Sequence, residues 1–305
     1  MILIRVDYGC QLACDYCYAR SLSLQVEPNV EKVLESVAKL GDDSVCIHGR
    51  EPLLAPHSLI KALSRGVRKM GMKFGVQTNG LALLNEDIWD KYLPLFDFIG
   101  VSWDGFLPGG ILRHKTEEGV RKVLRVIEKL AQDHSVGVIM VLSEKTTTDS
   151  LKMSLEALVK AKVKDVRLNP VHSPYPFVPN DYLIELYRVA FPFQADINLS
   201  PFTPQFKKDC SRNGCSPLGT RVPEVLLDGT LANCPKGVIT VWEGVSSFRE
   251  DLLRSMPQEN GGCKGCEIFG ECKGGCPATS PDGYTRSYYC PTWKEIFGHW
   301  IAVQK

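Results

Sequence analysis

The sequence lacks any long run of apolar residues. No stretch approaches the ~18 consecutive apolar residues from which a membrane-spanning helix is made. The N-terminal segment MILIRVDYG reaches Asp7 before the apolar core of a signal peptide can form. We therefore expect a cytoplasmic protein without a membrane partner.

An excess of charge of either sign is also absent. The chain of 305 residues carries 36 Lys and Arg against 35 Asp and Glu, which leaves a formal net charge of +1. Proteins that bind nucleic acid or anionic membranes through bulk electrostatics are usually strongly basic. The composition therefore gives no reason to expect nucleic acid as a partner.

Cysteine is missing from the long middle of the chain, residues 47–209, although the whole chain has 12 cysteines. Three of them lie within the first 17 residues, Cys46 is isolated, and eight follow residue 209. Disulfides are rare in chains without an export signal. Metal or iron–sulfur ligation is the better interpretation, and the distribution indicates two functional regions.

The first two-thirds of the chain alternates strand and helix patterns. Short apolar, β-branched runs predict strands, and apolar residues at helical spacing predict the helices between them. Repeated βα units imply a parallel sheet that binds its ligand at the carboxyl ends of the strands. The predicted strands are 2–6, 44–49, 73–80, 98–105, 136–142 and 165–171, and the helices are 29–40, 58–70, a short one capped by Asn85, 116–132, 149–161 and 180–190.

The strand and helix patterns of apolar residues stop near residue 200. The remaining chain is rich in Cys, Gly and Pro, as in GGCKGCEIFGECKGGCPATSPDGY. Such a segment has too few apolar residues for an ordinary core, and bound metal centres would supply its order instead. We predict an α/β domain over residues 1–200 and a cysteine-rich, irregular domain over residues 201–305.

Cys10, Cys14 and Cys17 form a C-x3-C-x2-C motif in the loop after the first predicted strand. A closed structural zinc site takes four ligands, so three cysteines leave one position open. Three thiolates select iron–sulfur chemistry or zinc. The motif therefore predicts a metal centre with a vacant position, which is the usual property of a catalytic site.

This motif, with Tyr16 before its last cysteine and a βα series behind it, resembles the radical S-adenosylmethionine (SAM) superfamily. The resemblance implies a partial (β/α)6 barrel resembling a TIM barrel. It implies that Cys10, Cys14 and Cys17 hold a catalytic [4Fe–4S] cluster, whose open iron binds SAM. Reductive cleavage of SAM then gives a 5′-deoxyadenosyl radical that abstracts hydrogen from the substrate. A flavodoxin- or ferredoxin-type reductant is the expected electron donor.

Other motifs of this superfamily recur in order at the strand ends. They are HGREP after the second strand, QTNG after the third and SWDG after the fourth. By resemblance, the first binds the methionine end of SAM, Ser102 contacts the ribose, and Tyr16 approaches the adenine. Arg50 stands where the family has its second glycine. The expected cofactor-binding residues are Tyr16, Gly49, Arg50, Glu51, Pro52, Thr78, Asn79, Ser102 and Asp104.

The later cysteines resemble the SPASM extension of radical SAM enzymes that modify peptides and proteins. Two spacings carry this resemblance, C-x13-G-x4-C around Gly229 and C-x2-C-x5-C-x3-C from Cys263. Likeness to anaerobic sulfatase maturases assigns two auxiliary [4Fe–4S] clusters; if Cys210 is free, the first of them has an open iron. The first cluster would be held by Cys210, Cys215, Cys234 and Cys276, and the second by Cys263, Cys266, Cys272 and Cys290.

One departure from the sulfatase maturases bears on the reaction. Those enzymes have an acid directly after the cysteine that aligns with Cys234, whereas Pro235 and Lys236 follow it here. Formylglycine formation is therefore disfavoured. We predict instead a crosslink, an epimerisation or an oxidation in a peptide or protein substrate. The chain starts at the first barrel strand, so a leader peptide would need a separate recognition protein.

Two alternatives stay open at this point. The same radical chemistry could act on a small molecule, in a dehydrogenation or in cofactor or natural-product biosynthesis. A hypothesis of another class is a non-catalytic zinc-binding protein, because CxxC spacing also suits zinc.

Overall fold

The computed structural model describes residues 1–20, 26–171, 175–202, 224–232, 258–272, 274–276, 279–280 and 285–300. Three of the predicted cluster ligands, Cys210, Cys215 and Cys234, lie outside these residues.

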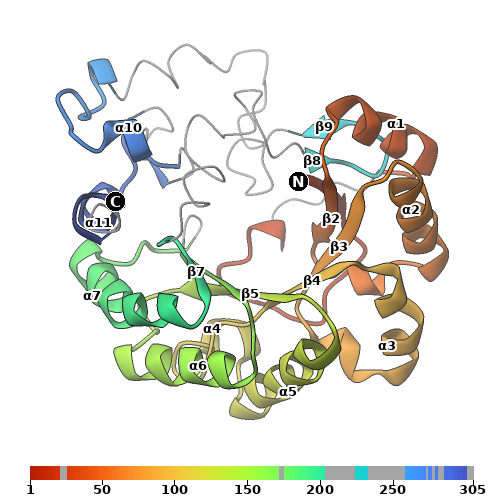
Figure 1. Cartoon of the computed structure of the whole chain (residues 1–305), viewed down its shortest axis with the longest axis horizontal. Coiled ribbons are helices and arrows are strands. Elements are labelled where there is room, and N and C mark those ends of the chain that lie inside the picture. Colours follow the sequence, from red (N-terminus) through yellow and green to blue (C-terminus); the bar gives the residue numbers. More distant parts are fainter. Residues whose placement is uncertain are drawn as a thin grey trace.

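A single curved sheet organises the described part of the chain (Figure 1). Its strand order is β7-β6-β5-β4-β3-β2-β1-β8-β9, and every neighbouring pair is parallel except the antiparallel pair β8–β9. The predicted α/β fold of a partial TIM-like barrel is confirmed. The strands are β1 (Ile2–Val6), β2 (Ser44–Gly49), β3 (Lys73–Thr78), β4 (Phe98–Ser102), β5 (Val136–Leu142), β6 (Asp165–Pro170), β7 (Asn198–Ser200), β8 (Glu224–Val225) and β9 (Leu231–Ala232).

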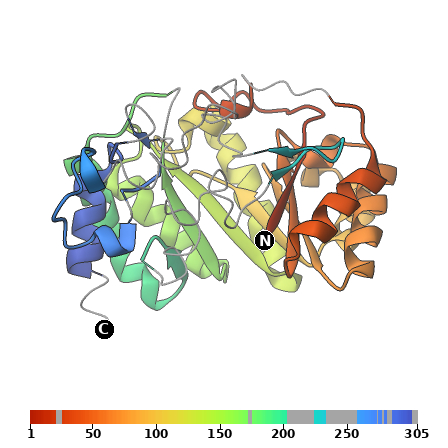
Figure 2. The same cartoon turned by 90° about the horizontal axis from the view of Figure 1, so that it is seen from above.

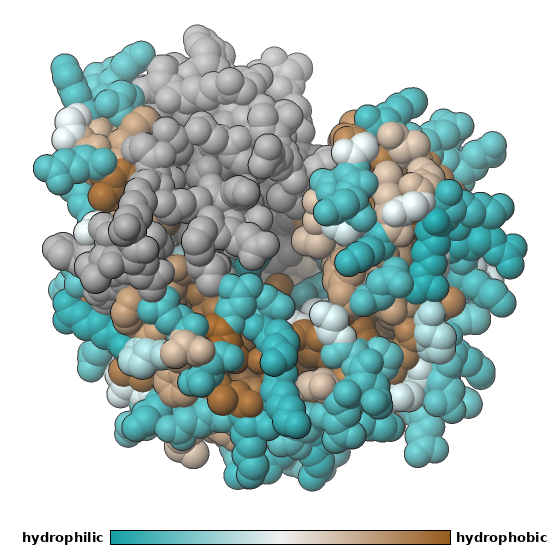
Figure 3. Space-filling model, in the orientation of Figure 1, coloured by the Kyte–Doolittle hydropathy of each residue, from teal (hydrophilic) through white to brown (hydrophobic). Residues whose placement is uncertain are grey.

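Helices cover the outer side of this sheet, and Figure 3 shows that their outward surface is mainly hydrophilic. They are α1 (Val30–Leu40), α2 (His57–Lys69), α3 (Glu86–Tyr92), α4 (Ile111–His114), α5 (Glu117–Asp133), α6 (Thr148–Lys160), α7 (Asn180–Ala190), α10 (Phe269–Cys272) and α11 (Cys290–Glu295). Short helical turns are η1 (Tyr18–Arg20), η2 (Pro52–Leu54), η3 (Leu81–Leu84), η4 (Leu93–Leu95), η5 (Phe191–Ala195) and the π-helical η10 (Ile296–Trp300).

Side-chain caps explain where several helices begin. Asn29, Asn85, Thr116 and Thr147 each accept a hydrogen bond from a backbone N–H in the first turn of α1, α3, α5 and α6. The cap predicted at Asn85 is thus confirmed. In the described part of the chain, no helix is both long and apolar enough to cross a bilayer.

The two faces of the sheet differ in polarity. Residues such as Ile4, Ile47 and Val76 alternate toward the helices and are fully buried in one core. The strand register places Ser102, Ile139, Arg167 and Ser200 side by side on the opposite, concave face. The concave face is therefore partly polar, as a binding surface requires.

The strand β8 brings a late segment of the chain to the first strand. It pairs with β1 (Figure 2). It also places Glu224, which is fully buried, beside Arg5 and His48. Gly229 lies in the turn to β9 with φ of +88°, and a Cβ there would come within 2.8 Å of the Lys32 carbonyl carbon. The glycine of the C-x13-G-x4-C pattern is thus required by this turn and its contact with α1.

The C-terminal described segment packs on the far end of the sheet. The Tyr289 hydroxyl donates a hydrogen bond to the Val171 carbonyl at 2.5 Å and accepts one from the Val178 N–H at 3.2 Å. Helix α11 packs against α7, where the Thr292 hydroxyl donates to Asn180. These contacts fix Cys290, the first residue of α11, beside the loop that follows β6.

Candidate active site

The three N-terminal cysteines lie on one loop at the carboxyl end of β1. Cys14 is buried and Cys10 is exposed. Burial raises the pKa of the Cys14 thiol to about 11; Arg113 lowers it, while Asp104, Cys17 and Cys10 raise it further. The three thiols lie on one short loop after β1, which is where the predicted iron–sulfur group needs its ligands.

Glu51 joins the turns after β2 and β3. Its carboxylate is fully buried and accepts hydrogen bonds from the Thr78 hydroxyl at 2.8 Å, the Asn79 N–H at 2.8 Å and the Leu53 N–H at 3.1 Å. Burial raises the pKa of Glu51, and these three donors oppose that rise. Both carboxylate oxygens are engaged, so Glu51 orders the neighbouring turns.

The replacement of a family glycine by Arg50 is compatible with the backbone. Gly49 has φ of +134°, and a Cβ there would come within 2.6 Å of the Val6 carbonyl oxygen. Arg50 is not among the residues of positive φ. Its N–H donates to Asp7 at 3.1 Å and its Nε to the Ala19 carbonyl at 3.4 Å, so the side chain lies against the end of the cysteine loop.

Asn79 contacts the first cysteine directly. Its side chain is 5% exposed, and its amide nitrogen lies 3.5 Å from Cys10 Sγ and 3.2 Å from the Gln11 amide oxygen. Its own amide oxygen accepts a hydrogen bond from the Leu81 N–H at 2.9 Å. The turn after β3 therefore touches the loop after β1.

Asp104 anchors the aromatic residue of the cysteine motif. Its Oδ2 accepts hydrogen bonds from the Tyr16 hydroxyl and from Arg113 Nε, the latter at 3.0 Å. Its Oδ1 accepts one from the Val141 N–H at 2.9 Å. The Arg113 guanidinium also lies 5.5 Å from the centre of the Tyr16 ring. This buried cluster ties the cysteine loop to β4, β5 and α4.

The remaining predicted cofactor residues lie at the same edge. Pro52 begins the turn η2, and the Ser102 hydroxyl accepts a hydrogen bond from the Gln77 amide at 2.9 Å on the concave face. The structure thus brings the loops after β1, β2, β3 and β4 together, as predicted for one cofactor site.

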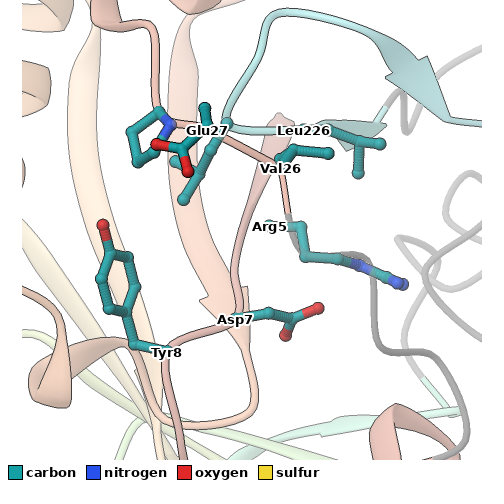
Figure 4. Close-up of a pocket in the computed structure, with 8 residues that line it drawn as sticks. Arg5, Asp7, Tyr8, Val26, Glu27 and Leu226 are labelled. Carbon is teal, nitrogen blue, oxygen red and sulfur yellow. The ribbon is translucent and has the colours of Figure 1, made fainter.

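A pocket of about 320 Å³ adjoins this edge between β1 and the β8–β9 turn (Figure 4). Figure 4 shows Arg5 and Asp7 extending to the same side of β1. Asp7 Oδ2 is buried without a hydrogen-bond partner among the described residues, and burial raises the pKa of Asp7 while Arg5 opposes the rise. The lining residues are Arg5, Asp7, Tyr8, Val26, Glu27, Pro28, Leu226 and Leu227.

A second group of thiols gathers near the C-terminus. Burial raises the pKa of Cys272 to about 11; the N–H of Gly274 lowers it, and Cys263, Cys266 and Cys290 raise it. These four cysteines are the set predicted for the second auxiliary cluster. Cys276 is not among the groups that shift the pKa of Cys272. Among the described residues, no three histidine, cysteine or acidic side chains are arranged to hold a single metal ion.

The model of the radical SAM superfamily matches residues 4–162, just over half of the chain. The chain belongs to the radical SAM superfamily. This family implies SAM and a [4Fe–4S] cluster, and the loop of Cys10, Cys14 and Cys17 is where this chain has thiols suited to the cluster.

Radical SAM relatives match nearly the whole chain. The cysteine-type anaerobic sulfatase-maturating enzyme of Clostridium perfringens strain 13 is 25% identical over 95% of this chain and 92% of its own length. The solved structure "Native anSMEcpe with bound AdoMet" has a TM-score of 0.71 at 20% identity, covering 99% of this chain and 96% of that one. Streptococcus suis SuiB bound to precursor peptide SuiA has a TM-score of 0.65 at 17% identity, covering 95% and 75%.

Several residues of the site were not predicted from the sequence. Arg113 and Gln11 contact the cysteine motif. Glu224 lies beside His48 and beside Arg5, from which it is 219 residues away along the chain. Glu224 has a pKa below its ordinary value: burial acts to raise it, but His48 and Arg5 outweigh burial. The sequence signal for this contact is the presence of two polar residues, Arg5 and His48, within the otherwise apolar strands β1 and β2, because such residues need a buried partner.

Proposed function

We propose that this radical SAM enzyme modifies a peptide or protein side chain by a crosslink, an epimerisation or an oxidation. The observation that carries the proposal is a second cysteine set, Cys263, Cys266, Cys272 and Cys290, which backbone hydrogen bonds hold in one segment, in a chain whose first loop has a separate cysteine triplet. Likeness over nearly the full chain to the sulfatase-maturating enzyme and to SuiB supports a peptide rather than a small molecule.

In this proposal the cysteine triplet holds the catalytic cluster and the later quartet holds an auxiliary one. When bound, SAM and this cluster would supply the chemistry that removes a hydrogen atom from the substrate. Cys276 joins Cys210, Cys215 and Cys234 as ligands of a further auxiliary cluster, the last three lying outside the described residues.

The chain's own residues orient the cofactor at the strand ends. Glu51 holds the turns after β2 and β3, and Asp104 fixes the ring of Tyr16 through its hydroxyl. Ser102 is placed on the concave face, where a ribose hydroxyl would be within reach. The expected reductant is a flavodoxin or ferredoxin.

Isotope transfer tests the proposal. Peptides encoded beside the gene are synthesised with deuterium on side-chain and α carbons and incubated anaerobically with SAM, dithionite and reconstituted enzyme. We expect deuterium in 5′-deoxyadenosine, and a crosslinked or oxidised peptide lighter by a pair of hydrogen atoms. Transfer from a deuterated small molecule, with none from any peptide, would show that the peptide proposal is wrong.

Two variants connect this test to the assigned cysteines. Cys14→Ala removes a proposed ligand of the catalytic cluster and should abolish 5′-deoxyadenosine formation. Cys46→Ala is the matched control, because Cys46 is a buried thiol within β2 that bonds only weakly to the Ile47 carbonyl. Continued SAM cleavage by Cys14→Ala would refute the assignment of the triplet.

A further inference from the structure

The sulfur of Cys10 accepts two hydrogen bonds from nitrogen. The donors are the Leu12 N–H at 3.4 Å and the Asn79 side-chain amide at 3.5 Å, distances normal for the large sulfur atom. The first donor belongs to the cysteine loop itself. The second comes from the turn after β3, which is 69 residues further along the chain.

The direction of the Asn79 amide is fixed by its other partners. Its oxygen accepts the Leu81 N–H at 2.9 Å, so its NH₂ group must face the opposite way, toward Cys10 and Gln11. The side chain is almost fully buried, which leaves it little freedom to rotate into water. The hydrogen bond to sulfur therefore follows from the packing and not from chance contact.

Glu51 fixes the turn that carries Asn79. The backbone N–H of Asn79 and the hydroxyl of Thr78 both donate to the Glu51 carboxylate, and the Gly80 N–H donates to Thr78 Oγ1 at 3.1 Å. Gly80 has φ of +81°, a conformation that favours glycine. The acid after β2 thus positions the amide after β3 against the cysteine after β1.

A hydrogen bond to a ligand sulfur changes the energy of an iron–sulfur cluster. It stabilises negative charge on the sulfur, and the reduced cluster carries one more negative charge than the oxidised one. Donors to ligand atoms are known to shift metal properties even though they do not touch the metal. Removing the donor should therefore make the cluster harder to reduce.

We infer that Asn79 is a positioning residue that raises the reduction potential of the catalytic cluster through its hydrogen bond to the Cys10 sulfur. This inference rests on the proposed role of Cys10 as a ligand of that cluster. It gives Asn79 a role toward the cluster in addition to the contact with SAM implied by family resemblance.

The test is a potential measured on anaerobically reconstituted, full-length enzyme by electron paramagnetic resonance, following the signal that added SAM changes. Asn79→Ser replaces the amide NH₂ donor with a shorter hydroxyl and adds no charge, and Asn79→Asp keeps the acceptor for the Leu81 N–H while losing the donor. At the wild-type midpoint we expect roughly a tenfold lower ratio of reduced to oxidised cluster in Asn79→Ser, about 59 mV for one electron. Asn79→Asp should shift further, because it also adds negative charge.

Gln11→Ala is the matched control. It removes the other acceptor of the same Asn79 amide and leaves both N–H donors on Cys10. Its potential should equal that of the wild type. The signals that SAM does not change should be unaffected in all three variants.

Two results would overturn the inference. One is an unchanged potential in Asn79→Ser. The other is loss of the SAM-sensitive signal from both Asn79 variants, which would show that Asn79 is needed only to hold the loop. If Cys10→Ala kept its full iron content and the SAM-sensitive signal, the proposed function of Cys10 would fail instead, separately from the role of Asn79.

Discussion

Three neighbouring residues at the site, Asp104, Arg113 and His114, are buried together but carry different charges. Arg113 is paired with Asp104 and stays protonated: burial acts to lower its pKa, but Asp104 and Tyr16 more than compensate. His114 is 5% exposed, and neither ring nitrogen has a hydrogen-bond partner within the described residues. Burial, helped by Arg113, lowers the pKa of His114 to about 4, with Asp104 acting in the opposite sense.

His114 should make stability depend on pH. The unfolded chain takes up a proton near pH 6.5, whereas the folded chain resists it until about pH 4. The contribution of neutral His114 to the free energy of unfolding is therefore complete above pH 6.5. It falls by about 3 kcal/mol as the pH drops from 6.5 to about 4. Urea unfolding of His114→Leu between pH 7 and pH 4 should show a flatter profile than the wild type.

His134→Leu is the control for that experiment, because His134 is a partly exposed histidine at the end of α5. Its profile should keep the wild-type slope. A His114→Leu profile as steep as the wild type would contradict the role assigned to His114.

At the scale of single residues, the sequence predicted which motifs follow the strand ends but not which hydrogen bonds their residues form. Motif order placed Glu51, Asn79 and Asp104 at consecutive strand ends, which the structure confirms. Motif order could not show that Asp104 accepts a hydrogen bond from the Tyr16 hydroxyl, 88 residues away, or that the Asn79 amide donates one to the Cys10 sulfur. Such contacts depend on strand order and loop packing, and these have no local signal in the sequence.

Among the elements, β8 has only two residues, but one of them, Glu224, places a buried negative charge beside β1. Glu224 on β8 lies 2.8 Å from Arg5 Nε and 2.8 Å from His48 Nε2. A carboxylate buried beside a buried guanidinium cannot be removed without leaving charge in a poorly solvated place. The edge of β1 therefore depends on β8 for electrostatic balance as well as for hydrogen bonds.

Glu224→Ala should lower the free energy of unfolding by about 3–5 kcal/mol, the usual cost of breaking a buried ion pair. The measurement is urea unfolding at pH 7. Asp228→Ala, in the same hairpin, removes only an acceptor for the Thr230 N–H and should cost about 1 kcal/mol or less. An equal, small loss in both variants would show that the Arg5–Glu224 pair contributes little.

The elements that the sequence revealed are the long ones. The strands β1, β2 and β5 and the helix α7 have the predicted bounds, because continuous apolar runs and helical spacing are strong signals. The predicted strand 73–80 ends at Thr78, since Glu51 accepts the next N–H in place of a neighbouring strand. Short elements such as α4, β7 and β8 contain too few residues for any period to emerge.

For the whole molecule, the cysteines divide into two groups that lie at different places on the sheet. The triplet follows β1, and the quartet of Cys263, Cys266, Cys272 and Cys290 is fixed near α7 by Tyr289 and α11. The division of the chain at residue 200 stays a prediction, although β8 and β9 show that later residues also complete the sheet.

The iron content of the protein should depend on these groups of cysteines. Anaerobically reconstituted protein should hold about twelve iron atoms if three four-iron clusters are bound. Cys272→Ala should lower this to about eight and keep the signal that SAM changes, whereas Cys46→Ala should keep all twelve or so. Bound zinc without a brown chromophore would contradict the iron–sulfur assignment and favour a non-catalytic zinc protein.

The place of β8 beside β1 also has a consequence for biosynthesis. On the ribosome, β1 emerges well before β8, because the strand that covers its outer edge is encoded 219 residues after Arg5. Until then, that edge exposes unpaired backbone groups and an unbalanced arginine, which is the kind of surface that recruits chaperones or aggregates. The sheet is completed only after β8 has emerged, and β1 must be protected throughout the interval.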